Sequence, residues 1–190
     1  MEGPEAVRAI LDQLEGFEAP AAAWEGDLFP SRVEDYDYQW LDALCTSGQL
    51  AWGRFRPPHN GRVLAGPIKT TPLAFVPRPN LQDWLPAEAP DEEELSHQAA
   101  AVLRVLREHG ALFFAEIAQR TRLLPDQVEQ GIGELVGRGR VTSDSFIGLR
   151  AFLVDAKYRT RAAARSRSRQ PLFSMSMAGR WSLFPMPSGE

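Results

Sequence analysis

The chain contains 190 residues, of which 44% are hydrophobic, and its formal net charge is −4 at pH 7. No apolar run in it approaches the ~20 residues that a membrane-spanning helix needs. One cysteine and three scattered histidines supply neither a disulfide framework nor the spacing of a metal site. We therefore expect a cytoplasmic protein without membrane, metal or cofactor partners of its own, folded as one medium domain or two small ones.

Charge is strongly segregated along the chain. Residues 1–38 contain ten acids against two arginines, a net −8. Residues 49–79 and 157–180 contain no acid and carry net charges of +5 and +7. Nineteen of the 21 basic residues are arginine, which suits bidentate phosphate contacts, although a GC-rich genome would give the same bias. The negative overall charge therefore does not exclude a polyanionic partner.

Residues 1–85 predict a first unit that begins with helices. Pro4 fits the first turn of a helix, and apolar residues recur at helical spacing from Val7 until Gly16. The expected elements are a helix over 4–16, a short turn or helix over 20–30, a helix over 36–47, strands over 49–56 and 72–77, and a short helix over 81–85. The acidic, proline-flanked stretch 86–95 is the predicted linker.

Residues 96–156 predict a second unit, with three helices and a hairpin. Ser96 can cap the first helix, which ends at Gly110, and Pro125 fits the first turn of the third. The second helix lies in GALFFAEIAQRT, the third in LLPDQVEQGIGELVGRG, and VTSDSF begins the hairpin. This order is typical of a winged helix.

The end of the chain changes character twice. Residues 157–170 are basic and low in apolar content, so we expect a flexible segment over 157–178. Residues 179–190 turn apolar again in AGRWSLFP, like the first strand of a sheet whose partners lie further on.

The sequences WLDALCTSGQLAW (40–52) and GIGELVGRGRVTS (131–143) follow one pattern, 91 residues apart. The matching pairs are Leu41 and Ile132, Leu44 and Leu135, Cys45 and Val136, Gly48 and Gly139, and Leu50 and Val141. Apolar residues three and four apart form a helix face, the glycine supplies a left-handed cap, and apolar–polar alternation then begins a strand. A single junction of this kind occurs in many α/β units, but two copies predict an α+β fold of tandem winged helices.

Three stretches together resemble a known family. They are AAAWEGDLFPSRVEDYDYQWLDALCTSGQLAWGR, HGALFFAEIAQRTRLLPDQVEQGIGELVGRGRVTSDSFIGLRAFL and GRWSL. They resemble the DEAD/H-associated region of the large helicase-related (Lhr) family of superfamily 2 DNA helicases. The resemblance implies a parent protein that is an ATP-dependent 3′-to-5′ translocase linked to DNA repair. It also implies tandem winged helices that lead into a β-barrel, so residues 179–190 would begin a truncated barrel.

The chain departs from that family in one decisive way. It has no GxxxxGK[ST] phosphate loop and no DEAD or DEAH box, so it cannot bind ATP as the family does. ATP and Mg²⁺ would belong to the motor domains of the parent, and those domains are the expected partners in cis. The other expected partner is single-stranded or tailed DNA, or RNA in a hybrid.

The residues that we expect to contact nucleic acid are Trp24, Arg32, Trp52, Arg54, Arg56, Arg120, Arg122, Arg138 and Arg140. Cationic groups bind phosphates, and flat side chains stack on unpaired bases. The period of two in strand 49–56 places Trp52, Arg54 and Arg56 on one outward face. For Trp24 and Trp52, burial in the core is an equally open interpretation.

Arginines near the third helix of the second unit are further phosphate candidates. Arg120 and Arg122 lie in the turn before this helix, and Arg138 and Arg140 flank its glycine cap. The latter two would also complement the negative end of the helix. For catalysis we identify no residue, since Asp144, the least implausible water-positioning group, sits in a turn where aspartate is common.

Three functions therefore remain open at this point. The first is a nucleic-acid-binding accessory module of a helicase. The second is part of a uracil-type DNA glycosylase, because the resemblance implies uracil removal by some family members. The third is a winged-helix connector that binds only protein through its acidic face.

Overall fold

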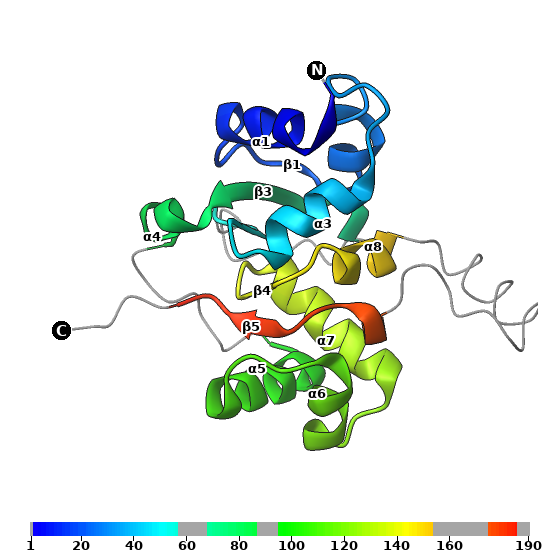
Figure 1. The fold of residues 1–190 in the computed structure, drawn as a ribbon. Helices are drawn as coiled ribbons and strands as arrows, with labels where there is room; N and C mark the ends of the chain where they lie inside the picture. Colours follow the sequence, from blue (N-terminus) through cyan, green and yellow to red (C-terminus); the bar gives the residue numbers. More distant parts are fainter. Residues whose placement is uncertain (1, 57–67, 87–94, 154–174, 186–190) are drawn as a thin grey trace, which may run out of the picture.

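A computed structural model describes residues 2–56, 68–86, 95–153 and 175–185 (Figure 1). The predicted linker at 86–95 and the basic segment at 157–178 lie largely outside the described residues, so the division of the chain at 86–95 stays a prediction. Figure 1 shows the strands of the molecule between α1 at one end and α5 and α6 at the other.

The first unit has the order of elements of a winged helix. They are α1 (Gly3–Gln13), β1 (Ala19–Pro20), α2 (Ala21–Ala23) running into the π-helix η1 (Trp24–Leu28), α3 (Tyr38–Thr46), β2 (Leu50–Gly53), η2 (Ile68–Thr70), β3 (Pro72–Pro77), η3 (Arg78–Asn80) and α4 (Leu81–Trp84). The three strands form an antiparallel sheet in the order β1-β3-β2. The predicted strand at 72–77 is confirmed, and the strand predicted at 49–56 covers only Leu50–Gly53.

Local sequence explains where the main helices of this unit begin. Helix α1 has proline in its first turn and buries Val7, Ile10 and Leu11 on one face. Helix α3 begins at a cap in which the Asp37 carboxylate accepts a hydrogen bond from the amide of Gln39 at 2.9 Å.

The second unit repeats this arrangement. Its elements are α5 (His97–His109), α6 (Phe114–Thr121), α7 (Pro125–Gly137), β4 (Val141–Ser143), α8 (Ile147–Leu153), η4 (Met175–Met177) and β5 (Trp181–Leu183). Strand β4 pairs antiparallel with β5, and Leu112 forms a bridge with Trp181. The order Leu112-β5-β4 therefore corresponds to β1-β3-β2. The predicted α+β fold of tandem winged helices is confirmed.

Strand β5 corrects the expectation for the end of the chain. Trp181–Leu183 is a strand, as predicted, but its partner is β4 of the same unit rather than a strand further on. It is thus the second strand of the second wing, and the described residues form no closed barrel. Sequence inspection missed this pairing because residues 144–180, including α8, lie between the two strands.

The repeated sequence pattern has the predicted role in both units. All eight apolar residues of the matching pairs are buried, on α3 and β2 in one copy and on α7 and β4 in the other. The two glycines adopt positive φ angles, 75° at Gly48 and 68° at Gly139, which L-residues rarely adopt. Each glycine ends its helix and turns the chain directly into the wing.

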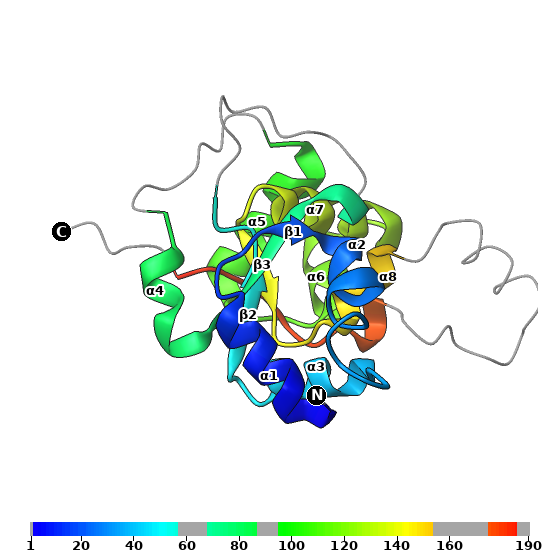
Figure 2. The same cartoon turned by 90° about the horizontal axis from the view of Figure 1, so that it is seen from above.

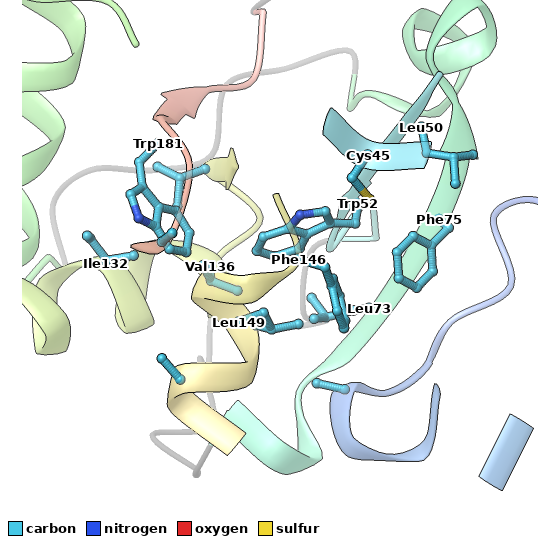
Figure 3. Close-up of a cluster of buried hydrophobic side chains, with 14 of the residues drawn as sticks. Cys45, Leu50, Trp52, Leu73, Phe75, Ile132, Val136, Phe146, Leu149 and Trp181 are labelled. Atoms are coloured by element: carbon cyan, nitrogen blue, oxygen red, sulfur yellow. The ribbon is translucent and has the colours of Figure 1, made fainter. Parts of the chain in front are cut away.

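The two units share one hydrophobic core (Figure 3). Trp52 of β2 packs edge-on against Trp181 of β5, with ring centroids 6.0 Å apart, and against Phe146, with centroids 5.7 Å apart. The Thr142 hydroxyl donates a hydrogen bond to the Trp52 carbonyl at 2.7 Å. The wings of the two units therefore pack against each other, and Figure 2 shows α8 of the second unit near α2 of the first, where Arg150 bonds to Glu25.

Candidate nucleic-acid interface

Trp24 and Trp52 are core residues, and the predicted stacking role is wrong for both. Each side chain is 0% exposed. The indole N–H of Trp24 donates to the carbonyl of Leu73 at 2.9 Å, and that of Trp52 donates to the carbonyl of Ser145 at 3.3 Å. Because no indole face is open to solvent, neither ring can stack on a base.

The outward face predicted for residues 49–56 is also absent. All four residues of β2 are buried, so the strand is covered on both faces. Leu50 and Trp52 enter the shared core, whereas Ala51 and Phe55 enter a second, smaller cluster with Phe184. An alternating apolar–polar pattern indicates a strand with one solvent-exposed face, but here the second unit covers that face.

Three of the predicted phosphate-binding arginines meet at the C-terminal end of α7. Arg54 donates from Nη1 to the carbonyl of Gly137 at 2.7 Å, so it satisfies a carbonyl that the helix leaves unpaired. Burial lowers the pKa of Arg54. Arg138 pairs with Glu134 at 3.1 Å, and Arg140 is only 6% exposed. The alternative interpretation, cations that complement the negative helix end, fits this geometry better than phosphate contact.

The other four predicted arginines are exposed, but they do not form one patch. Arg32 lies in the first unit and donates to the carbonyl of Leu28 at 3.1 Å. Arg56 lies at the first wing. Arg120 and Arg122 lie together at the end of α6, where Arg122 adopts a left-handed conformation with φ of 57°.

A buried ionic cluster, which the sequence analysis missed, joins α8 to the first unit. Arg150 donates from Nε and Nη2 to the carboxylate of Glu25 at 2.6 and 2.8 Å, and from Nη1 to Asp42. The Tyr36 hydroxyl donates to Glu25 at 2.7 Å. We call these four residues the Arg150 cluster. Its signal in the sequence is one arginine inside the apolar segment IGLRAFL, because a charge in such a segment needs a buried partner.

Burial and charge shift the pKa values of the cluster. Burial raises the pKa of Asp42, although Arg150 works against the shift. Burial, with the Glu25 charge, raises the pKa of Tyr36. For Arg150, burial lowers the pKa, but the hydrogen bonds and charges of Glu25 and Asp42 outweigh it and raise the pKa overall. The guanidinium therefore stays charged and paired.

Comparison with known proteins shows which family the first unit resembles. Residues 1–77 match the family described as "Large helicase-related protein, winged-helix domain". Over these residues, the chain is therefore similar to the winged-helix domain of that family. The matched region runs from the start of the chain to the last residue of β3, which is the whole β1-β3-β2 sheet with its helices.

Two curated relatives extend the similarity over almost the whole chain. The "Lhr helicase/uracil glycosylase" of Escherichia coli (strain K12) is 29% identical over 202 residues, which cover 96% of this chain and 13% of the relative. The "Lhr helicase/ probable uracil glycosylase" of Mycolicibacterium smegmatis is 28% identical over 200 residues, covering 96% of this chain and 12% of the relative. The chain thus spans a small part of these large helicase-related proteins.

Neither a catalytic carboxylate nor a metal site emerges from the described residues. Asp144 accepts hydrogen bonds from the amide of Arg180 at 2.7 Å and from its Nε at 3.1 Å, so Arg180 occupies both carboxylate oxygens. No group of three His, Cys, Asp or Glu side chains in the described ranges is arranged to hold a metal ion. No described helix is long and apolar enough to cross a membrane.

Proposed function

We propose that this chain is a nucleic-acid-binding accessory module of an ATP-dependent 3′-to-5′ DNA helicase that acts in DNA repair. The module guides the translocated single strand, and the motor domains are its partners in cis. The observation that carries the proposal is the tandem winged-helix fold together with similarity to two Lhr helicases over 96% of the chain. Winged helices commonly bind nucleic acid, and the relatives are named as helicases.

The motor chemistry lies outside this chain in our proposal. The sequence contains no glycine-rich phosphate loop, so its residues do not fit ATP and Mg²⁺. We therefore expect the purified chain to show no ATP hydrolysis and no unwinding, with or without DNA. Its contribution is binding and positioning of the strand.

Binding titrations test the proposal directly. The chain is titrated into fluorescently labelled oligothymidylate, tailed duplex DNA and a tailed RNA–DNA hybrid across a salt series. We expect weak binding that falls steeply with salt, because each phosphate contact contributes about 0.7 to 0.9 to the slope of log K against log salt. Absence of binding to all three probes at low salt would contradict the proposal and favour the protein-binding connector.

Uracil excision is the second candidate function, because the names of both relatives include uracil glycosylase. Incubation of the chain with a uracil-containing oligonucleotide, followed by alkaline cleavage, tests it. Excision by the chain alone would support this candidate. Binding without excision would leave the accessory role.

A further inference from the structure

In a winged helix the recognition helix is the one that precedes the wing, which is α3 in the first unit and α7 in the second. Neither of these two helices contains a lysine or an arginine. Helix α3 is YQWLDALCT, with Asp42 as its charged residue, and α7 is PDQVEQGIGELVG, with one aspartate and two glutamates. A helix that enters a groove approaches two phosphate backbones, so cations on it or beside it normally supply much of the affinity. Net charges of −1 and −3 therefore disfavour both helices as phosphate-facing elements.

Packing within the chain also occupies these helices. On α3, the Asp42 carboxylate and the Tyr38 carbonyl accept hydrogen bonds from Arg150 of α8. On α7, a Cβ added at Gly133 would lie 3.4 Å from Ile68 of the first unit and 3.5 Å from Phe152 of α8. The C-terminal half of α7 is thus covered, and its exposed N-terminal half carries acidic and amide side chains.

Exposed cations gather instead on α5 and α6. These two helices lie at the end of the molecule opposite α1 (Figure 1). Residues three or four apart lie on one face of a helix, and Arg104 and Arg107, three apart, are both exposed on α5. Arg120 of α6 lies 3.2 Å from the Nε2 of His109 at the end of α5, and Arg122 follows it. We call Arg104, Arg107, His109, Arg120 and Arg122 the α5–α6 edge.

The segment that forms this edge carries a net positive charge. Glu108 lies 3.9 Å from His109, and Glu116 accepts a hydrogen bond from the Phe113 amide, so it is engaged in capping its own helix. Residues 97–122 contain four arginines and two glutamates, a net +2, in contrast to the negative charge of both recognition helices.

We infer that the α5–α6 edge, and not either recognition helix, contacts the phosphates of a nucleic-acid strand. The inference rests on the proposed nucleic-acid binding and specifies its surface. Phosphate contacts carry no sequence information. Binding by this module is therefore independent of base sequence, as a strand-guiding element requires.

Two substitutions at the edge test the inference without unfolding the protein. Arg122 occupies a left-handed position that glycine adopts without strain, so Arg122→Gly removes the charge and suits the backbone. Arg120→Gln keeps the length and polarity of an exposed side chain. We expect each variant to weaken oligothymidylate binding and to lower the salt slope by about 0.7. Arg8→Gln, an exposed arginine of α1, is the matched control and should leave both quantities unchanged.

Two substitutions that add a positive charge test whether a strand passes along either recognition helix. Gln39→Lys adds a cation to the exposed face of α3, and Gln130→Lys adds one to the exposed half of α7. A strand that passes along either helix would bind the lysine variant more tightly, with a steeper salt slope. We expect neither change.

The outcomes separate the surface from the function. If the unmodified chain fails to bind the probe, the proposed function fails and the inference with it. If the chain binds, but the two edge variants bind like Arg8→Gln, the inference alone is overturned. Tighter binding by either lysine variant also overturns it, because the strand would then lie on a recognition helix.

Discussion

Arg150 and Glu25 lie 125 residues apart in sequence and form a two-pronged ion pair, with N–O distances of 2.6 and 2.8 Å. The pair connects α8 of the second unit to the π-helix of the first. Its side chains are 5% and 17% exposed, so water screens it far less than an ion pair at the surface. A buried charge that loses its partner is costly, which makes this pair a sensitive point of contact between the units.

We therefore expect Arg150→Met to destabilise the protein strongly. Methionine fills a similar apolar volume but leaves the Glu25 and Asp42 carboxylates buried without a cation. Removal of one partner from a buried ion pair typically costs about 3–5 kcal/mol. Urea unfolding followed by circular dichroism measures the change in the free energy of unfolding.

Arg180→Met is the matched control for this measurement. Arg180 pairs with Asp144 at 3.1 Å, but the two side chains are 56% and 33% exposed. An exposed pair contributes about 0–1 kcal/mol, so the control should lose little stability. Equal losses in the two variants would show that the Arg150 cluster is no more important than a surface pair.

Asp42 gives a prediction about pH. Because burial raises its pKa above the ordinary value of 3.8, the folded protein binds the Asp42 proton more tightly than the unfolded chain does. The stabilising contribution of Asp42 is then fully present below pH 3.8 and is lost as pH rises through the raised pKa. The free energy of unfolding of the parent, relative to Asp42→Asn, should therefore fall from acid to neutral pH.

The comparison with Asp42→Asn isolates this one group, because all other carboxylates titrate in both proteins. The two pH profiles are measured by urea unfolding at matched ionic strength. A difference that grows with pH would mean that the attraction of Arg150 outweighs burial, and that the pKa of Asp42 is lowered instead.

The sequence predicted those features that depend on neighbours in the chain. The helix–glycine–strand junctions at Gly48 and Gly139 were recognisable because periodicity and the cap are local signals. The pairing of β4 with β5 was not, since α8 and an intervening segment separate the two strands. The contact that buries Trp52 was equally invisible, because a strand that alternates in sequence gives no sign that a second unit covers its outer face.

For the candidate site, too, the sequence predicted local features but not those that depend on contacts between the units. Arginine content indicated a polyanionic partner, but not which guanidinium groups the fold would use internally. Arg54 became a helix cap because the second unit brought the end of α7 to it. Arg120 and Arg122, in the last turn and at the C-cap of α6, remained exposed as local sequence suggested.

Cys45 should be unreactive while the protein is folded. The thiol is 1% exposed, and burial raises its pKa, so little thiolate is available to react. We expect Ellman's reagent to modify it slowly in buffer and rapidly in urea. The glutathione peptide provides the rate of an exposed thiol under the same conditions. Modification in buffer at the rate of the peptide would contradict the burial of α3 against the core.

The paired glycines of the two junctions allow a matched test of how the units contact each other. Gly48→Ala places a side chain at φ of 75°, but a Cβ there meets nothing within 4 Å. We expect it to cost only the strain of the left-handed conformation, about 1–2 kcal/mol. Gly139→Ala has the same strain at φ of 68°, but its Cβ would lie 2.3 Å from the carbonyl oxygen of Arg54.

That oxygen belongs to the backbone of the first unit, so it cannot move aside as the end of a flexible side chain would. Gly139→Ala should therefore destabilise the protein clearly more than Gly48→Ala in urea unfolding. It should also disturb the hydrogen bond between Arg54 and the end of α7, because the same residue supplies both contacts. Equal losses at the two glycines would mean that the first unit does not press on the second at this junction, and that the shared packing of the wings is looser than described.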